Sequence, residues 1–159
     1  SVVVSSALEP PASDETPRLL SETLRRRTSQ ITLFAIGTGE HELHNLATGS
    51  TAGHTTSVSD AFTGQKLNVS YKRNDRTSVI SVKTNHSWIV FQSESSTSER
   101  VDLLLLDEAD QVVKSHPIHV RELTILFFDP PAAPVRLKAV VQEPRPFEFK
   151  FAPPEVVDE

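Results

Sequence analysis

Hydrophobic residues follow two different spacings along the chain. Before about residue 62 they come in short continuous runs or at helical spacing, and from Leu67 onward they alternate with polar residues. Continuous runs are typical of strands covered on both faces, whereas alternation is typical of half-buried strands. We therefore predict an α+β protein, with a short α/β segment over residues 1–62, an antiparallel β-sandwich over 65–152 and a disordered acidic tail over 153–159.

Strands and helices are predicted to alternate in the first part. The apolar runs Val2–Val4 and Ile31–Ile36 each predict a strand of a parallel sheet. The helix between them would have Thr16 as its N-cap, Pro17 at its first position and the cations of Arg25–Arg27 at its C-terminal end. The positions that mark the helices are Leu20, Thr23 and Leu24 in the first, and Leu43, Leu46 and Ala47 in the second, with Gly49 as its cap.

The second part is predicted to contain strands only. Its connections are polar or contain proline, and Asp107–Asp110 fits the turn of a hairpin. Short strands at this spacing are typical of an antiparallel sandwich. The predicted strands are Leu67–Tyr71, Ser78–Lys83, Trp88–Gln92, Val101–Asp107, Gln111–Lys114, Leu123–Phe128, Val135–Gln142 and Phe147–Phe151.

A strand, a glycine turn and a short helix are expected in succession between residues 31 and 62. The positions that mark them are Ile36-Gly37-Thr38-Gly39, Leu43, Leu46-Ala47, Gly53 and Val58. This string resembles the closing segment of a von Willebrand factor A-type domain. Together with the Val2–Val4 strand, it most resembles the A-domain of hemicentin-like extracellular proteins. The resemblance implies an extracellular protein in which a β-rich segment follows the A-domain.

Two departures from the A-type pattern bear on metal binding. The family's metal site begins with an Asp-x-Ser-x-Ser loop, which this sequence lacks, and its later Asp is met here by Ser5-Ser6-Ala7. A serine cannot replace a carboxylate ligand of a divalent cation. We therefore predict no metal site and no tight binding of divalent metal.

The N-terminal strand carries a second resemblance. Ser1–Val4 is similar to the start of the downstream fragment that self-cleavage leaves in SEA-type domains. The strands at Val2–Val4 and Ile31–Ile36 need cover on both faces, but the sequence predicts only two short helices to provide it. We therefore expect a protein partner to complete the sheet, for instance an upstream fragment of the same precursor, and residues 1–60 to be ordered only with it.

Histidines are the densest group of possible metal ligands. The candidates are His41, His44 and His54 in one cluster, and His116 and His119 in another. On a helix His41 and His44 would share a face, but no further ligand follows from the spacing, so a solvated helix start is the favoured interpretation. The second pair lies along an extended segment and is interpreted as surface histidines beside a strand.

Composition narrows the function further. The chain of 159 residues has no cysteine, so thiolate nucleophiles and thiolate metal sites are excluded. With 16 Lys and Arg against 21 Asp and Glu, no basic face for nucleic acid is expected. No apolar run approaches the ~20 residues of a membrane span. Because no Gly-x-Ser-x-Gly elbow or phosphate loop occurs, we predict no catalytic residue and no cofactor.

Two N-glycosylation sequons begin at Asn68 and Asn85. Together with the A-type resemblance they favour a secreted protein. We therefore expect a non-enzymatic extracellular adhesion or assembly module that binds a protein partner. The competing class is an intracellular scaffold or carrier domain, and a hydrolase with a Ser/His site ranks third.

Phe147, Phe149 and Phe151 alternate along one predicted strand, which would either seal the sandwich or contact a partner.

Overall fold

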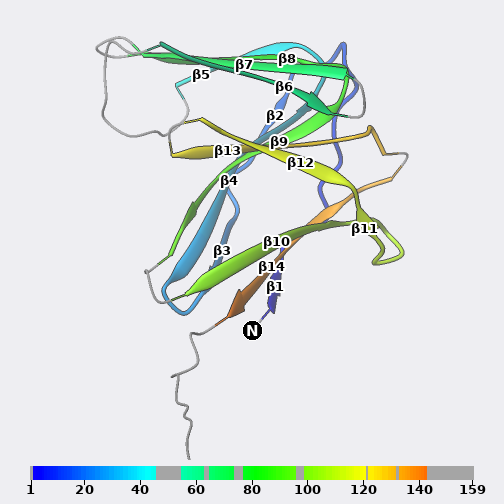
Figure 1. Cartoon of the computed structure of the whole chain (residues 1–159). Coiled ribbons are helices and arrows are strands. Elements are labelled where there is room, and N and C mark those ends of the chain that lie inside the picture. The colour runs from blue at the N-terminus through cyan, green and yellow to red at the C-terminus, as the bar shows by residue number, and fades with distance from the viewer. Residues whose placement is uncertain are drawn as a thin grey trace, which may run out of the picture.

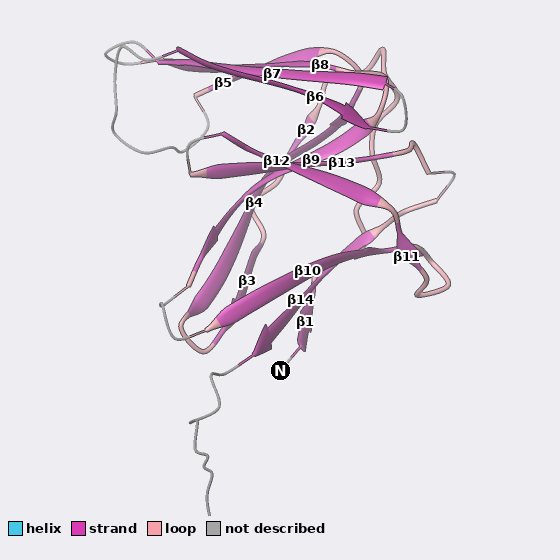
Figure 2. Ribbon diagram, viewed as in Figure 1, coloured by secondary structure: helices cyan, strands magenta, loops and turns pink. Residues whose placement is uncertain are grey.

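Three antiparallel sheets make up the structure, a computed structural model that describes residues 2–45, 55–62, 65–73, 77–95, 99–120, 122–131 and 133–142. The sheets lie one above another, and we call them the upper, middle and lower sheets after their places in Figure 1. The described ranges contain strands and loops but no helix (Figure 2), and so none that could cross a membrane. The predicted α+β class is therefore wrong, and the fold is all-β.

The middle and lower sheets combine strands that are far apart in the chain, whereas the strands of the upper sheet all lie between residues 41 and 83. The middle sheet consists of β12 (Ser115–Val120), β13 (Leu123–Phe128), β9 (Ser87–Glu94), β4 (Ser29–Thr38) and β2 (Arg18–Leu19), and β3 (Thr23–Arg26) also pairs with β4. The upper sheet consists of β5 (His41–His44), β8 (Ser78–Lys83), β7 (Gln65–Arg73) and β6 (Thr55–Phe62). The lower sheet consists of β1 (Val2–Val4), β14 (Arg136–Gln142), β10 (Arg100–Leu106) and β11 (Val112–Val113).

Every pairing between these strands is antiparallel, so the predicted parallel sheet is also wrong. The predicted boundary between residues 62 and 65 falls between β6 and β7, which pair with each other from Thr55 opposite Lys72 to Phe62 opposite Gln65. The predicted strand at Phe147–Phe151 and the tail at 153–159 lie outside the described residues.

Both faces of the middle sheet are covered, which gives the molecule two hydrophobic cores. In β9, Trp88 and Val90 belong to the upper core, between the middle and upper sheets, whereas Ile89 and Phe91 belong to the lower core. Successive side chains of a strand point to opposite faces, so a strand in this position needs apolar residues without interruption. The unbroken apolar run of the sequence is therefore the signature of this central layer.

A β-bulge in β4 lets one strand serve both cores. The register against β9 shifts between Leu33 and Ala35, so that Phe34 is the extra residue. Leu33 and Ile36 face the lower core, while Ala35 faces the upper core, where Phe34 packs as a partly buried side chain. The cover that the sequence predicted for both faces of Ile31–Ile36 is present, but two antiparallel sheets provide it rather than helices.

The first predicted helix is replaced by β2 and β3, which pair with β4. Leu20 and Leu24 are four residues apart, a spacing that places side chains on one face of a strand as well as on one face of a helix. Both leucines contact the lower core. Arg25 and Arg26 end β3 instead of ending a helix, and Arg27 lies in the turn to β4 with φ of 59°.

The second predicted helix is wrong where it can be compared. Residues 41–44 form β5, in which Leu43 is buried in the upper core. Leu46, Ala47 and Gly49 lie outside the described residues.

Several predicted strands agree with the structure. β8 and β13 have the predicted bounds, and Asp107–Asp110 forms the turn between β10 and β11, with Asp107 N–H donating to Gln111 O at 2.9 Å. The sequence reasoning missed β12, because a proline and two histidines interrupt its apolar pattern. Pro117 can lie there because β12 is an edge strand, where a missing N–H is tolerated.

The N-terminal strand belongs to the lower sheet of the same chain. Val2 to Val4 pair with Val140 to Lys138 in β14. This pairing and the two covering sheets supply within the chain what the sequence reasoning assigned to a second polypeptide. Completion of the sheet therefore provides no argument for a partner, and a partner has to be sought at the surface.

Gly37 and Gly39 place the indole of Trp88, the largest fully buried side chain. A Cβ atom at Gly37 would lie 2.6 Å from Trp88 Cζ2, so only glycine leaves room for the ring. Gly39 has φ of 82°, and its carbonyl oxygen accepts a hydrogen bond from Trp88 Nε1 at 2.9 Å. The Gly-x-Gly string on which the A-type resemblance depends thus serves a buried tryptophan at the end of β4.

We predict that Gly37→Ala lowers the free energy of unfolding by about 1–3 kcal/mol, because the new methyl group overlaps the indole. Denaturant unfolding measures the loss. In a Trp88→Phe background the ring is smaller and the same substitution should cost less, so the two changes should be non-additive. Strict additivity would contradict the contact.

Two hydrogen bonds join the β3–β4 turn to Glu99, the residue before β10. The hydroxyls of Thr28 and Ser29 each donate to Glu99 Oε1 at 2.6 Å. The hydrogen bond from Ser29, that from Thr28 and the nearby charge of Arg27 together hold the pKa of Glu99 below its ordinary value of 4.5. The ionised form of Glu99 is therefore favoured by folding.

This lowered pKa predicts a pH dependence of stability. The contribution of Glu99 is present above pH 4.5 and is lost as the pH falls through the lower pKa of the folded state. Glu99→Gln removes it, so the stability difference between the wild type and this variant should shrink as the pH is lowered from about 6 to about 3. Urea unfolding across that range tests it, and a constant difference would exclude the linkage.

Candidate functional site

The predicted histidine candidates do not gather in the structure. His41 and His44 lie on β5, where a separation of three places their side chains on opposite faces of the sheet. The His41 ring donates from Nε2 to the carbonyl oxygen of Ser13 at 3.1 Å, and exposed His44 lies 3.7 Å from Glu42 Oε1. His54 is outside the described residues. The shared helix face that would have allowed chelation is therefore absent.

The second histidine pair is also divided between two faces. His116 and His119 are three residues apart on β12, and His119 Nδ1 lies 3.0 Å from the Thr124 hydroxyl across the ladder to β13. Within the part of the chain that the structure describes, no three His, Asp or Glu side chains gather as metal ligands would.

Both sequons lie at surface positions. Leu67, Val69 and Tyr71 of β7 are buried in the upper core, so alternation places Asn68 on the outer face of the upper sheet. Asn85 is exposed in the short connection between β8 and β9. Either side chain could therefore carry a glycan without disturbing a core.

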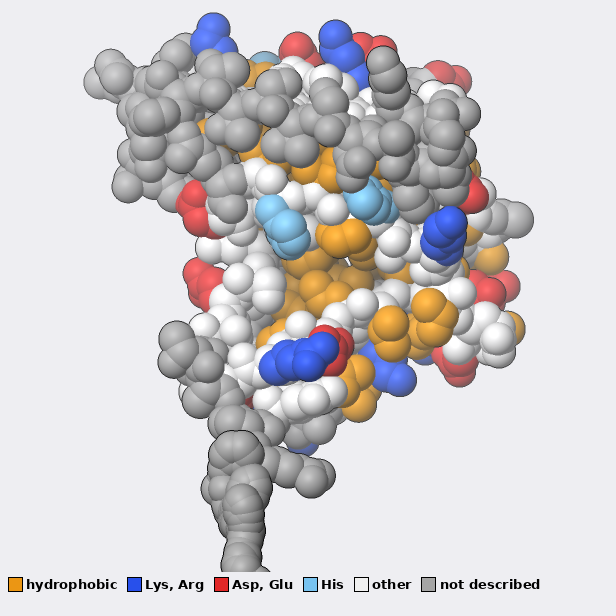
Figure 3. All heavy atoms as spheres, viewed as in Figure 1, with side chains coloured by type: hydrophobic (Ala, Val, Ile, Leu, Met, Phe, Trp, Pro, Cys, Tyr) orange, Lys and Arg blue, Asp and Glu red, His pale blue; other side chains and the backbone are white. Residues whose placement is uncertain are grey.

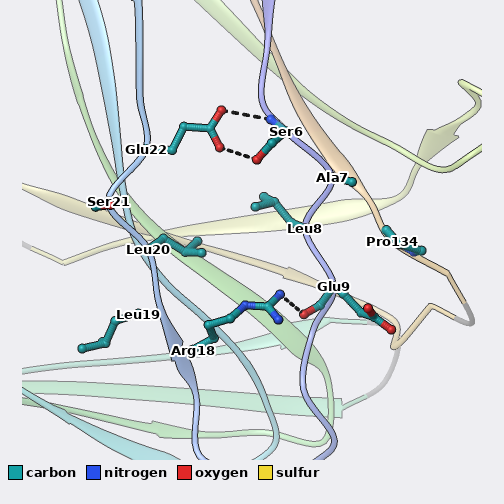
Figure 4. A pocket seen from close by; sticks show the side chains of 10 residues that line it. All are labelled: Ser6, Ala7, Leu8, Glu9, Arg18, Leu19, Leu20, Ser21, Glu22 and Pro134. Carbon is teal, nitrogen blue, oxygen red and sulfur yellow. Dashed lines mark hydrogen bonds between the residues drawn. The ribbon is translucent and has the colours of Figure 1, made fainter.

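The strongest candidate site is a groove of about 500 Å³ between two chain segments at the side of the molecule. Residues 6–9 form one wall, and residues 18–22 form the other (Figure 4). The first wall continues β1 and is bonded to the lower sheet, since Leu8 N–H donates to Val135 O at 2.7 Å. The second wall is the outer edge of the middle sheet. We call this site the edge groove.

The floor of the edge groove is apolar. Leu8 is buried, Leu20 is partly buried, and both contact the lower core. At the rim, Leu19 is the most exposed large hydrophobic residue of the described chain, at 70%. An occupant would therefore meet hydrophobic contacts at the floor and at one edge.

Side chains, rather than a backbone ladder, join the two walls. Ser6 donates its backbone N–H to Glu22 Oε2 at 2.9 Å and its hydroxyl to Glu22 Oε1 at 2.6 Å. At the other end, the Arg18 guanidinium donates to the carbonyl oxygen of Glu9, and the Glu9 carboxylate is turned away from it (Figure 4). Walls that need long side chains to meet are farther apart than the ~4.8 Å of paired strands.

The second wall has backbone groups that β4 does not use. Leu20 N–H donates to Phe34 O at 2.8 Å, so residue 20 uses its backbone to bond β4. The N–H and C=O groups of successive residues point to opposite sides of a strand, so those of Leu19, the last residue of β2, are directed away from β4. The edge groove thus presents an unpaired strand edge next to an apolar floor.

A second recess lies on the face shown in Figure 3, where hydrophobic side chains form the bottom of a hollow between β12 and β10. The partly buried residues Val101, Leu103 and Val113 of the lower sheet pack against the lower core on β10 and β11. The edge groove is the stronger candidate because it combines apolar contact with directed backbone groups and two charged side chains.

Sequence reasoning missed the edge groove. Its local signal is the alternation of Arg18, Leu20, Glu22 and Leu24, but Leu20 and Leu24 also fit the helical spacing that predicts a helix there. The opposite wall comes from residues 6–9, and only the tertiary fold brings it there. Comparison of the chain with protein-family models, curated proteins and solved structures finds no match, so function is inferred from this groove and from the surface around it.

Proposed function

We propose that the protein is a non-enzymatic, extracellular adhesion or assembly module that binds an extended segment of a partner protein in the edge groove. The observation that carries the proposal is the unpaired edge of β2 at Leu19 beside the apolar floor of Leu8 and Leu20. Strand addition to such an edge gains affinity from backbone hydrogen bonds and specificity from the side chains at alternate positions.

An exposed strand edge is also a hazard, because it can pair with any extended chain. Here the gap is crossed by the Glu22–Ser6 and Arg18–Glu9 contacts, which occupy it when no partner is bound. Ser6, Glu9 and Arg18 are exposed, so a partner can exchange these contacts for its own without leaving them out of water. The groove is therefore crossed by side-chain contacts that a specific segment can replace.

The extracellular part of the proposal is supported by the two sequons, which lie at surface positions. An intracellular scaffold or carrier could bind a peptide in the same groove. The two locations differ in whether Asn68 and Asn85 receive glycans.

Replacement of Leu19 by proline tests strand addition. The N–H of Leu19 points away from β4, so Leu19→Pro removes a group that only the partner uses, and Leu19→Ala keeps it as a matched control. Peptides selected from a random displayed library on the immobilised full chain should bind the proline variant about tenfold more weakly than the alanine variant.

Hydrogen exchange locates the binding and checks the fold of both variants. The amide of Leu19 in the wild type should become protected when a selected peptide binds. Equal affinity of the proline and alanine variants, without protection at residue 19 of the wild type, would contradict the proposal.

Glycosylation tests the location. We predict that protein secreted from a eukaryotic host carries N-linked glycans, because both sequons lie at surface positions. Intact mass measurement should show one glycan fewer in Asn68→Gln and in Asn85→Gln. Unmodified asparagine at both positions would favour the intracellular alternative.

A further inference from the structure

Two of the three charged residues that line the edge groove have neutral partners. Arg18 donates to the backbone carbonyl of Glu9, and Glu22 accepts from the backbone N–H and hydroxyl of Ser6 (Figure 4). A partner of opposite charge would add Coulomb attraction to the hydrogen bond that each side chain makes. Both side chains would therefore gain from an occupant of opposite charge.

The two charged side chains point the same way. Arg18, Leu20 and Glu22 are all directed toward residues 6–9 (Figure 4). Leu20 lies between the two charged residues in the chain, and both Leu20 and Leu8 of the opposite wall contact the lower core. The wall thus presents the series cation, leucine, anion in the direction of the chain.

We infer that the edge groove selects a partner segment with a basic residue, an apolar residue and an acidic residue at successive even positions, bound antiparallel to residues 18–22. This inference rests on the proposed function and gives the chemistry and direction of its ligand. In antiparallel pairing the basic residue lies opposite Glu22, the apolar residue opposite Leu20 and the acidic residue opposite Arg18.

The opposite direction is disfavoured by the same charges. A segment of reversed sequence places its acid opposite Glu22 and its base opposite Arg18, and like charges directly opposite each other destabilise a strand pair. The reversed segment can restore charge pairing only by running parallel to residues 18–22, where the bonding groups are slanted and paired less well. The groove therefore discriminates between bound segments by their chain direction as well as by their residue types.

Two capped synthetic peptides of the same composition separate these cases. One has the core Lys-Thr-Leu-Thr-Glu and the other the core Glu-Thr-Leu-Thr-Lys, each flanked by the same threonines, with acetylated and amidated ends. Isothermal titration with the full chain should show about tenfold tighter binding of the first peptide, because two favourable charge pairs replace two unfavourable ones. The preference should decrease as salt is added.

Variants of the walls provide the control. The double variant Arg18→Glu with Glu22→Arg should reverse the preference, while Glu22→Gln, which can still accept from Ser6, should reduce it. Thermal unfolding confirms that each variant is folded.

The outcomes distinguish this inference from the proposed function. Equal binding of both peptides, with the amide of Leu19 protected, would overturn the direction and charge preference but leave strand addition in place. Failure of both peptides to bind or to protect this amide, together with failure of library peptides, would overturn both. A preference that persists unchanged in the double variant would also overturn the inference.

Discussion

Burial of the middle sheet on both faces is the constraint on which the rest of the structure depends. β4, β9 and β13 send alternate side chains into the upper and lower cores, so that a change of volume in one core is felt by the strands of the other. The bulge at Phe34 lets β4 place side chains in both cores, and the lack of a side chain at Gly37 leaves room for the ring of Trp88. The polar outer layers need less exact packing, because each has one face in water.

The edge groove follows from the way in which the lower core is closed at its side. The middle sheet ends at β2, and the middle and lower sheets do not pair with each other. Along residues 6–9 and 18–22 the closure consists of two leucines and two side-chain bridges. A site for an extended segment therefore arises where two sheets approach without completing a common ladder.

The sequence predicts strands well wherever one spacing is unambiguous. Alternation and turn residues located β8 and β13, and the unbroken run at Ile31–Ile36 correctly indicated cover on two faces. The helices were wrong for a physical reason: a spacing of four, as between Leu20 and Leu24, satisfies both helix and strand, and pairing with β4 decides between them.

The candidate site was less accessible to sequence reasoning than the strands. Its charged residues are local, but their meaning depends on residues 6–9, which reach the groove through pairing with β14 far along the chain. Gly37 and Gly39 can be seen in the sequence, but the reason that glycine is needed there cannot. That reason is the indole of Trp88, which lies on a strand about 50 residues later.

Pairing of β1 with β14 also decides how the molecule would respond to tension. Val2 lies opposite Val140, close to Gln142 at the end of β14, so the two ends of the described fold leave the lower sheet at the same place. A force that separates these ends acts along the interstrand hydrogen bonds, which are perpendicular to antiparallel strands, and so loads them one pair after another. Under such a force β1 would separate from β14 one hydrogen-bonded pair at a time. The force needed would be lower than for strands that are pulled along their length, where all the pairs are loaded together.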